Sequence, residues 1–136
     1  VYGLPQWMRY ERIDFDYYSK LNVHISQNLF LDPFSPEAQA FKETFFRRYG
    51  TMPTIEAYLG YDVMSYFGQM IHKYGTRFQY ALESEPENGI SMAFDLERLV
   101  DFSSGRTENL PIQQFENKHI YILKFQDYNF VPAARY

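Results

Sequence analysis

The feature that most constrains this chain is a pair of consecutive amphipathic helices, expected over residues 36–49 and 55–74. Ser35 can accept hydrogen bonds from the free N–H groups of the first turn, and Pro36 suits the first helical position, where its missing N–H is not needed. A glycine follows the last turn of each helix, as it commonly does at helix ends. Two such helices need a further surface against which to bury their apolar sides.

The apolar side chains of both helices recur at helical spacing. In the first helix they form one stripe, Ala38, Phe41, Phe45 and Tyr49. In the second helix the expected buried face consists of Ile55, Leu59, Val63, Phe67, Met70, Ile71 and Tyr74. Gly60 and Gly68 also lie inside the second helix, where a glycine costs about 1 kcal/mol relative to alanine. Two glycines in one helix predict that another element packs closely against it.

Strand and turn signals flank the helices on both sides. Short helices are expected at 14–20, with Asp14 as N-cap, and at 77–84. Strands are expected at 1–4, 22–27, 90–94, 99–102, 118–126 and 129–132, with a tight turn at 103–106. This order of strands and helices predicts an α/β fold.

Composition excludes several classes of function. A net charge of −4, with 13 scattered lysines and arginines, argues against nucleic acid as a partner. The absence of cysteine excludes disulfides and thiolate sites, and the sequence has no run of about 20 apolar residues. The 13 tyrosines and 13 phenylalanines suit a core as well as ligand or protein contacts. The N-terminus lacks the features of a signal peptide, and we expect the chain to be cut from a longer protein.

Residues that could carry catalysis are scattered. The three histidines stand far apart, without partners at metal-ligand spacing: His24, His72 and His119. Neither Ser65 nor Ser91 lies in a nucleophile motif. The glutamates around a proline turn, Glu83, Glu85 and Glu87, are interpreted as solvated surface. The sequence therefore predicts no enzyme, no metal and no cofactor.

One stretch resembles a known family. Residues 41–53 read F-K-E-T-F-F-R-R-Y-G-T-M-P, and residues 57–63 read A-Y-L-G-Y-D-V. This resembles the F…F…Y-G…P…A-x-x-G-Y-D-A stretch of type 1 periplasmic binding proteins, the leucine/isoleucine/valine-binding group. Residues 89–95 and 118–131 resemble later segments of that family in the same order. The resemblance spans almost the whole chain, but only the C-terminal part of a full family member.

The resemblance implies the C-terminal portion of a two-lobed α/β fold, with parallel sheets flanked by helices and a hinge crossing. Residues 1–31 and 118–136 would be second-lobe elements, and residues 32–117 would be first-lobe helical elements without their main sheet. The apolar stripes of the two helices would then lack their native cover. We therefore expect self-association or repacking of the chain.

In this family a solute binds between the lobes, and the hinge closes around it. The resemblance implies ligand contacts from Gln6 and Trp7 on the second-lobe rim, and from Glu56, Tyr58 and Tyr61 on the helix that faces the cleft. Trp7 can equally be a packing anchor. Tyr61 fits a structural role better, as does its neighbour Asp62, which makes Tyr58 the preferred contact.

The turn at residues 3–7 departs from the family pattern. It reads G-L-P-Q-W and lacks the acid that holds the ligand's ammonium group in the amino-acid binders. An amino acid is then the default ligand, while an apolar, aromatic or sugar-like ligand would suit the tryptophan and tyrosines equally well.

The resemblance implies an extracytoplasmic solute-binding module for ABC-type uptake or sensing. It further implies a small-molecule ligand, a membrane permease or envelope partner, and a periplasmic or cell-envelope location, with a lipid anchor as one option in the full-length protein. The alternative is a cell-envelope structural or interaction domain that retains the fold without a transport ligand. The missing acid and the high aromatic content motivate this alternative.

Overall fold

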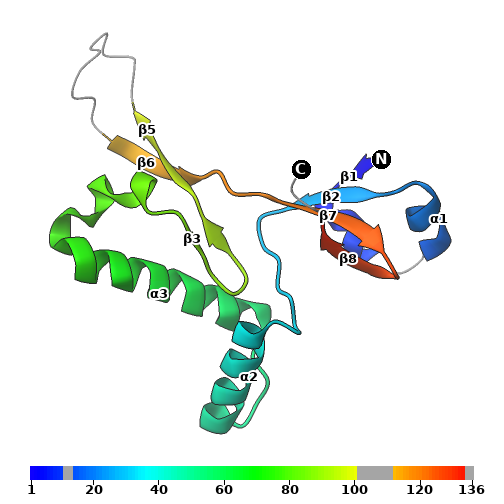
Figure 1. The fold of residues 1–136 in the computed structure, drawn as a ribbon, viewed down its shortest axis with the longest axis horizontal. Coiled ribbons are helices and arrows are strands. Elements are labelled where there is room, and N and C mark those ends of the chain that lie inside the picture. Colours follow the sequence, from blue (N-terminus) through cyan, green and yellow to red (C-terminus); the bar gives the residue numbers. More distant parts are fainter. Residues whose placement is uncertain (11–13, 101–111, 134–136) are drawn as a thin grey trace. The chain divides into compact units, whose positions relative to one another are not determined.

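The computed structural model describes residues 1–10, 14–100 and 112–133 (Figure 1). The chain divides into two compact units. Unit 1 consists of Val1–Phe30 and Ile120–Tyr136, and unit 2 consists of Leu31–His119. Unit 1 is therefore built from both ends of the chain, with unit 2 inserted between them. Each unit combines helices with strands, which confirms the predicted α/β class.

Unit 1 contains a four-stranded sheet in the order β1-β2-β7-β8. The strands are β1 (Tyr2–Gly3), β2 (His24–Gln27), β7 (Tyr121–Gln126) and β8 (Asn129–Pro132). β1 pairs with β2 in parallel, as the family resemblance implies, whereas β2–β7 and β7–β8 are antiparallel. The two residues between β7 and β8, Asp127 and Tyr128, have φ values of 51° and 62°. Such a two-residue turn joins only antiparallel neighbours.

The core of unit 1 lies between the sheet and two short helices. These are the 3-10 helix η1 (Pro5–Arg9) and α1 (Phe15–Lys20). Asp14 caps α1 as predicted, because its carboxylate accepts a hydrogen bond from the N–H of Asp16 at 3.0 Å. The buried cluster contains Tyr18, Val23, Ile25, Leu123 and Phe125, with Trp7, Phe30, Tyr121 and Phe130 packed against it.

Unit 2 begins with the two predicted helices, α2 (Pro36–Tyr49) and α3 (Ile55–Tyr74). The caps of α2 are those that the sequence predicts. The Ser35 hydroxyl accepts a hydrogen bond from the N–H of Ala38 at 3.2 Å, and Gly50 adopts a left-handed conformation with φ of 70°. Among the described residues, no helix is long and apolar enough to cross a membrane.

The rest of unit 2 folds back over α3 (Figure 1). Two 3-10 helices, η2 (Gly75–Tyr80) and η3 (Leu82–Ser84), replace the single helix expected at 77–84. Two antiparallel pairs follow, β3 (Glu87–Asn88) with β4 (Ala93–Phe94), and β5 (Leu96–Val100) with β6 (Ile112–Asn117). The sequence predicted no strand at β6, and the turn expected at 103–106 lies outside the described residues. The core cluster contains Tyr66, Met70, Leu82 and Phe94.

The prediction for the buried face of α3 is wrong in part. The residues of this helix that are fully buried are Tyr58, Asp62, Tyr66 and Met70. Ile55 and Ile71, which the sequence placed in the core, are 41% and 52% exposed. The polar atoms of Asp62 and Tyr66 have hydrogen-bond partners in unit 2, and burial of a polar group is tolerated when it is paired. The buried face of α3 therefore lies to one side of the predicted apolar stripe and includes two tyrosines and an aspartate.

Candidate functional site

The predicted ligand contacts of unit 1 lie in η1. Gln6 is exposed, whereas Trp7 is half-buried and packs against the core cluster of this unit. The main-chain oxygen of Trp7 accepts a hydrogen bond from the Tyr18 hydroxyl at 2.8 Å. The indole ring also lies against Gly3 so closely that a Cβ at that position would overlap it. Trp7 is thus a packing anchor of unit 1, one of its two anticipated roles, and a ligand-binding role rests on the part of its ring that stays accessible.

The predicted contacts of unit 2 lie in the first two turns of α3. Glu56 is exposed, and a hydrogen bond from the Thr54 hydroxyl lowers the pKa of its carboxyl. Tyr58 is buried, with 6% of its surface exposed, whereas Tyr61 is 50% exposed. Exposure therefore favours Tyr61 over Tyr58 as a contact for a ligand.

Phe41 of α2 connects the two tyrosines. Its ring centroid lies 4.7 Å from that of Tyr58 and 5.0 Å from that of Tyr61. These distances are typical of aromatic pairs, which prefer tilted or offset contacts. The three rings form an aromatic cluster at the α2–α3 contact. The sequence placed Phe41 in the apolar stripe of its helix, but gave no signal that it would contact both tyrosines, because that contact depends on how the two helices cross.

The five predicted site residues therefore form two groups. Gln6 and Trp7 are neighbours in unit 1. Glu56, Tyr58 and Tyr61 lie in the first two turns of α3 in unit 2, where Phe41 contacts both tyrosines. Each group is held on a helical segment that is packed against the core of its own unit.

Asp62 has the most fully paired polar side chain among the residues described. It is 2% exposed, and its two carboxylate oxygens accept hydrogen bonds from the N–H groups of Ile90, Ser91 and Met92 at 2.7, 2.7 and 3.1 Å. The Ser91 hydroxyl donates a further bond at 2.7 Å. Several N–H groups directed at one carboxylate stabilise its charge in a buried place. The structural role that the sequence favoured for Asp62 fits this geometry.

Gly89 allows Asp62 to enter this turn. A Cβ at position 89 would lie 2.5 Å from the carboxylate carbon of Asp62 and 2.7 Å from the main-chain oxygen of Met92. Because one of these neighbours is main chain, a side chain would displace the turn. Asp62 lies four residues from both Tyr58 and Tyr66, and so on the same side of the helix. The sequence placed none of the three in the expected buried face and gave no signal for this contact.

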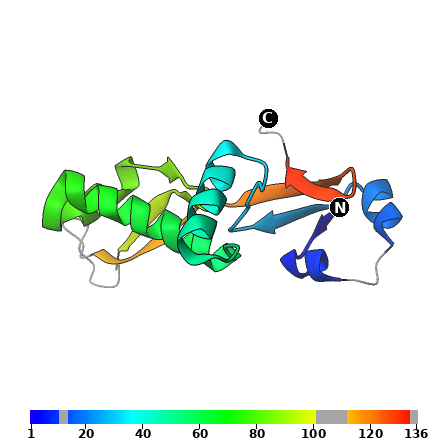
Figure 2. The same cartoon turned by 90° about the horizontal axis from the view of Figure 1, so that it is seen from below.

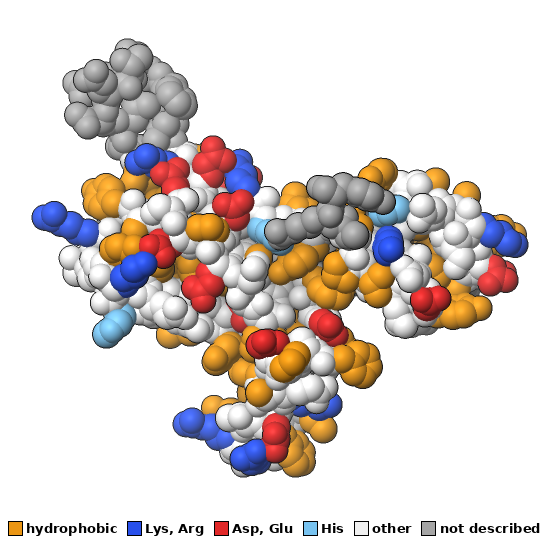
Figure 3. Space-filling model, in the orientation of Figure 1, with side chains coloured by type: hydrophobic (Ala, Val, Ile, Leu, Met, Phe, Trp, Pro, Cys, Tyr) orange, Lys and Arg blue, Asp and Glu red, His pale blue; other side chains and the backbone are white. Residues whose placement is uncertain are grey.

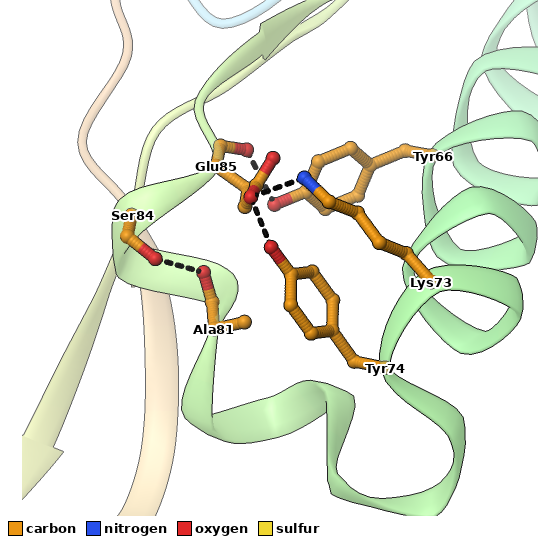
Figure 4. Close-up of polar contacts among 6 residues, drawn as sticks. All are labelled: Tyr66, Lys73, Tyr74, Ala81, Ser84 and Glu85. Atoms are coloured by element: carbon orange, nitrogen blue, oxygen red, sulfur yellow. Dashed lines mark hydrogen bonds and ion pairs between the residues drawn. The ribbon is translucent and has the colours of Figure 1, made fainter.

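A second polar cluster joins the end of α3 to the segment after η3 (Figure 4). The Glu85 carboxylate accepts hydrogen bonds from the Lys73 ammonium, at 2.6 Å, and from the Tyr74 hydroxyl, while the Tyr66 hydroxyl donates to the Glu85 main-chain oxygen at 3.1 Å. These bonds lower the pKa of Glu85 and raise that of Lys73. Burial raises the pKa of the Tyr66 hydroxyl.

The glutamates that the sequence interpreted as solvated surface are paired. In addition to Glu85, Glu83 forms an ion pair with Arg98 at 2.8 Å, and Glu87 accepts a hydrogen bond from Gln69 at 3.4 Å. These contacts attach the turn to α3 and β5. The pairing partners lie more than ten residues away in the sequence, so no local pattern could reveal them.

A metal site would require several ligating side chains in one place. In the described part of the chain, no group of three or more histidines, aspartates or glutamates is close enough to hold an ion.

Comparisons with known proteins do not assign this chain to a family. No protein-family model matches this chain. No curated protein matches it either. A search of solved structures finds the ABC transporter substrate-binding protein from Desulfitobacterium hafniense in complex with Leu, at 23% sequence identity and a TM-score of 0.43. The match covers 82% of this chain and 31% of that protein. A likeness at this level does not carry a function across.

Proposed function

We propose that this chain is part of an extracytoplasmic solute-binding protein that binds a small ligand. The observation that carries the proposal is the connectivity of the units. Unit 2 is inserted into unit 1, so the chain passes between them twice, after Phe30 and after His119. Two crossings of this kind can act as a hinge, because a few residues absorb the change in backbone angles while each unit stays rigid. In this proposal unit 1 is part of the second lobe and unit 2 part of the first.

The side chains available in unit 2 suit an amphipathic ligand. The exposed part of Tyr61, supported by Phe41, offers an aromatic face for stacking. Glu56 is exposed in the first turn of the same helix, and the pKa of its carboxyl is lowered from its ordinary value. Since the turn at residues 3–7 supplies no acid, we propose Glu56 as the partner for a cationic group of the ligand. Tyr58 would act by holding Phe41 in place.

Unit 1 would contribute Gln6 and Trp7. The Gln6 side chain can donate and accept hydrogen bonds, and the Trp7 ring can stack on an apolar or sugar-like ligand. An amino acid or a similar small solute is the ligand class we propose, delivered to a membrane permease for ABC-type uptake or to a sensor. The corresponding location is the periplasm or the cell envelope.

A ligand panel tests this proposal directly. Isothermal titration with amino acids, short peptides and sugars should identify a ligand, and Trp7 is the single tryptophan of the chain, so its fluorescence should change on binding. Tyr61→Ala and Glu56→Gln should each weaken binding about tenfold or more, roughly 1.4 kcal/mol, while circular dichroism shows that each variant remains folded. Tyr80→Ala, at another exposed tyrosine, is the control. If no solute in the panel binds, or if both variants bind like the wild type, the proposal is wrong.

The alternative, a cell-envelope interaction domain, is favoured by a different observation. Hydrophobic side chains lie at the surface of both units (Figure 3). Those more than 60% exposed include Tyr2, Leu4, Tyr128, Phe34, Met64 and Tyr80. Exposed apolar side chains commonly mark contacts with other proteins where they gather into a contiguous patch. Recovery of one envelope protein in stoichiometric amount, together with no response to any solute, would favour this alternative.

A further inference from the structure

The side of α3 that faces away from the core of unit 2 is apolar. Five residues at spacings of three and four form what we call the outer stripe: Ala57, Gly60, Met64, Gly68 and Ile71. Met64 is 75% exposed and Ile71 is 52% exposed. Figure 2 shows α3 in front of the strands of this unit, with its outer side uncovered along most of its length. A soluble helix normally places polar residues on this side.

The two glycines of the stripe have no neighbour that would explain them. A Cβ built at Gly60 or at Gly68 would meet no other atom within 4 Å. Glycine in the middle of a helix is unfavourable relative to alanine, and it is used where another backbone must come close. Within the described residues of unit 2, no element takes that place, so the glycines leave this side of α3 open to the close approach of another surface.

We propose that the outer stripe of α3 binds the same stripe of a second copy of this chain, with the two helices antiparallel and Met64 at the two-fold axis. The spacing of the stripe residues about Met64 is symmetric, which suits a second copy of the same helix. Gly60 and Gly68 each lie four residues from Met64, and Ala57 and Ile71 each lie seven residues from it. In an antiparallel pair Gly60 of one copy then faces Gly68 of the other, and Ala57 faces Ile71. A two-fold interface requires this reciprocity, in which residue i contacts j and j contacts i.

The charges at the ends of α3 favour the antiparallel arrangement. The first turn carries Glu56, and the last turn carries His72 and Lys73. His72 and Lys73 are both exposed, and Lys73 is also paired with Glu85 of its own chain. Antiparallel pairing places the acidic turn of one copy beside the basic turn of the other, and it also opposes the two helix dipoles. Parallel pairing would bring like ends together.

The length of the outer stripe limits the affinity that we expect for the dimer. From residue 57 to residue 71 the helix rises about 21 Å. A single helix pair of this length buries less than the roughly 800 Å² per partner that is usual for a stable interface. We therefore expect a weak dimer that forms with increasing concentration.

Sedimentation velocity from low micromolar to submillimolar concentration tests the dimer. The wild-type chain should shift from monomer to dimer. Met64→Glu and Gly68→Leu should remain monomeric at every concentration, because one buries a charge at the axis and the other blocks the close approach. Tyr80→Glu changes another exposed apolar residue, outside the stripe, and should dimerise like the wild type. Circular dichroism confirms that each variant is folded.

Cysteine cross-linking tests the two-fold axis separately. The chain has no cysteine, so Met64→Cys introduces a single thiol. Under mild oxidation with diamide it should form a disulfide-linked dimer at least tenfold faster than Tyr80→Cys. The proposal is overturned if the wild-type chain stays monomeric at every concentration. The stripe would then be a surface for a different protein. The proposal is also overturned by a Met64→Glu variant that still dimerises, or by a Met64→Cys variant that cross-links no faster than the control.

Discussion

The carboxylate of Asp62 accepts two hydrogen bonds from one residue, Ser91, whose N–H and hydroxyl both lie 2.7 Å from Oδ2. Asp62 is in the middle of α3, and Ser91 is in the turn between β3 and β4. This contact holds the hairpin against the helix and thereby closes the core of unit 2.

Asp62→Ala should destabilise unit 2 by about 3 kcal/mol or more, because it leaves buried N–H groups and a hydroxyl without an acceptor. Asp62→Asn keeps one acceptor oxygen and should cost less. Urea unfolding followed by circular dichroism measures both. Asp95→Ala, at an exposed aspartate of the same unit, is the control and should change the midpoint little. Equal midpoints for Asp62→Ala and Asp95→Ala would contradict this account of the turn.

The glycines of unit 2 should respond to alanine in opposite directions. Gly89→Ala places a Cβ against the Asp62 carboxylate and the Met92 main chain, so it should lower the unfolding midpoint. Gly60→Ala and Gly68→Ala meet open space in the same helix and should each stabilise the monomer by roughly 0.5–1 kcal/mol. Thermal unfolding at low micromolar concentration, where self-association is minimal, compares the three. A stabilising Gly89→Ala would show that the turn is arranged differently.

The pair of Glu85 with Lys73 should make stability depend on pH in acid. The pKa of Glu85 in the folded chain lies below the ordinary value of 4.5, because Lys73 and Tyr74 donate hydrogen bonds to the ionised form. A group with a depressed folded pKa contributes stability above the pKa of the unfolded state, and the contribution is lost as the pH falls through the folded pKa. Glu85 therefore stabilises unit 2 at neutral pH, and the effect fades below about pH 4.5.

Glu85→Gln is the corresponding variant. It should have a lower urea midpoint than the wild type at pH 7, and the two midpoints should converge as the pH falls below 4.5. Repeating the comparison in a Lys73→Met background removes the main partner, so the difference at pH 7 should shrink. A difference that stays constant across this range, or that survives in the Lys73→Met background, would assign the effect to another group.

The parts of the fold that local chemistry determines could be predicted from the sequence. The bounds of α2 follow from Ser35 and Pro36 at one end and Gly50 at the other, and the structure has all three in those roles. The cap of α1 by Asp14 is of the same kind. The predicted ligand contacts rested on the family resemblance and not on local chemistry, and their role in binding stays a prediction.

The missed parts depend on residues far apart in the chain. Strand β6 escaped detection because its apolar residues, Ile112 and Phe115, are three apart and do not alternate. The pairing with β5 explains this spacing, since Leu99 pairs with Gln114 and Val100 with Ile112, which leaves one extra residue as a bulge. The buried face of α3 was misjudged because hydrophobicity favours Ile71, whereas the distant main-chain groups that pair with Asp62 and Tyr66 decide burial.

Two variants of Tyr66 should distinguish the contribution of its ring to the stability of unit 2 from that of its hydroxyl. Its ring stacks on Phe94 with centroids 4.3 Å apart and planes 3° from parallel, and its hydroxyl donates to the Glu85 main-chain oxygen at 3.1 Å. Tyr66→Phe keeps the stack and removes one hydrogen bond, which should cost about 1 kcal/mol. Tyr66→Ala opens a cavity and should cost roughly 3–5 kcal/mol. Tyr80→Phe, at an exposed tyrosine, should leave the urea midpoint unchanged. If Tyr66→Phe lowered the midpoint as much as Tyr66→Ala, the hydroxyl contact would outweigh the packing of the ring, contrary to this expectation.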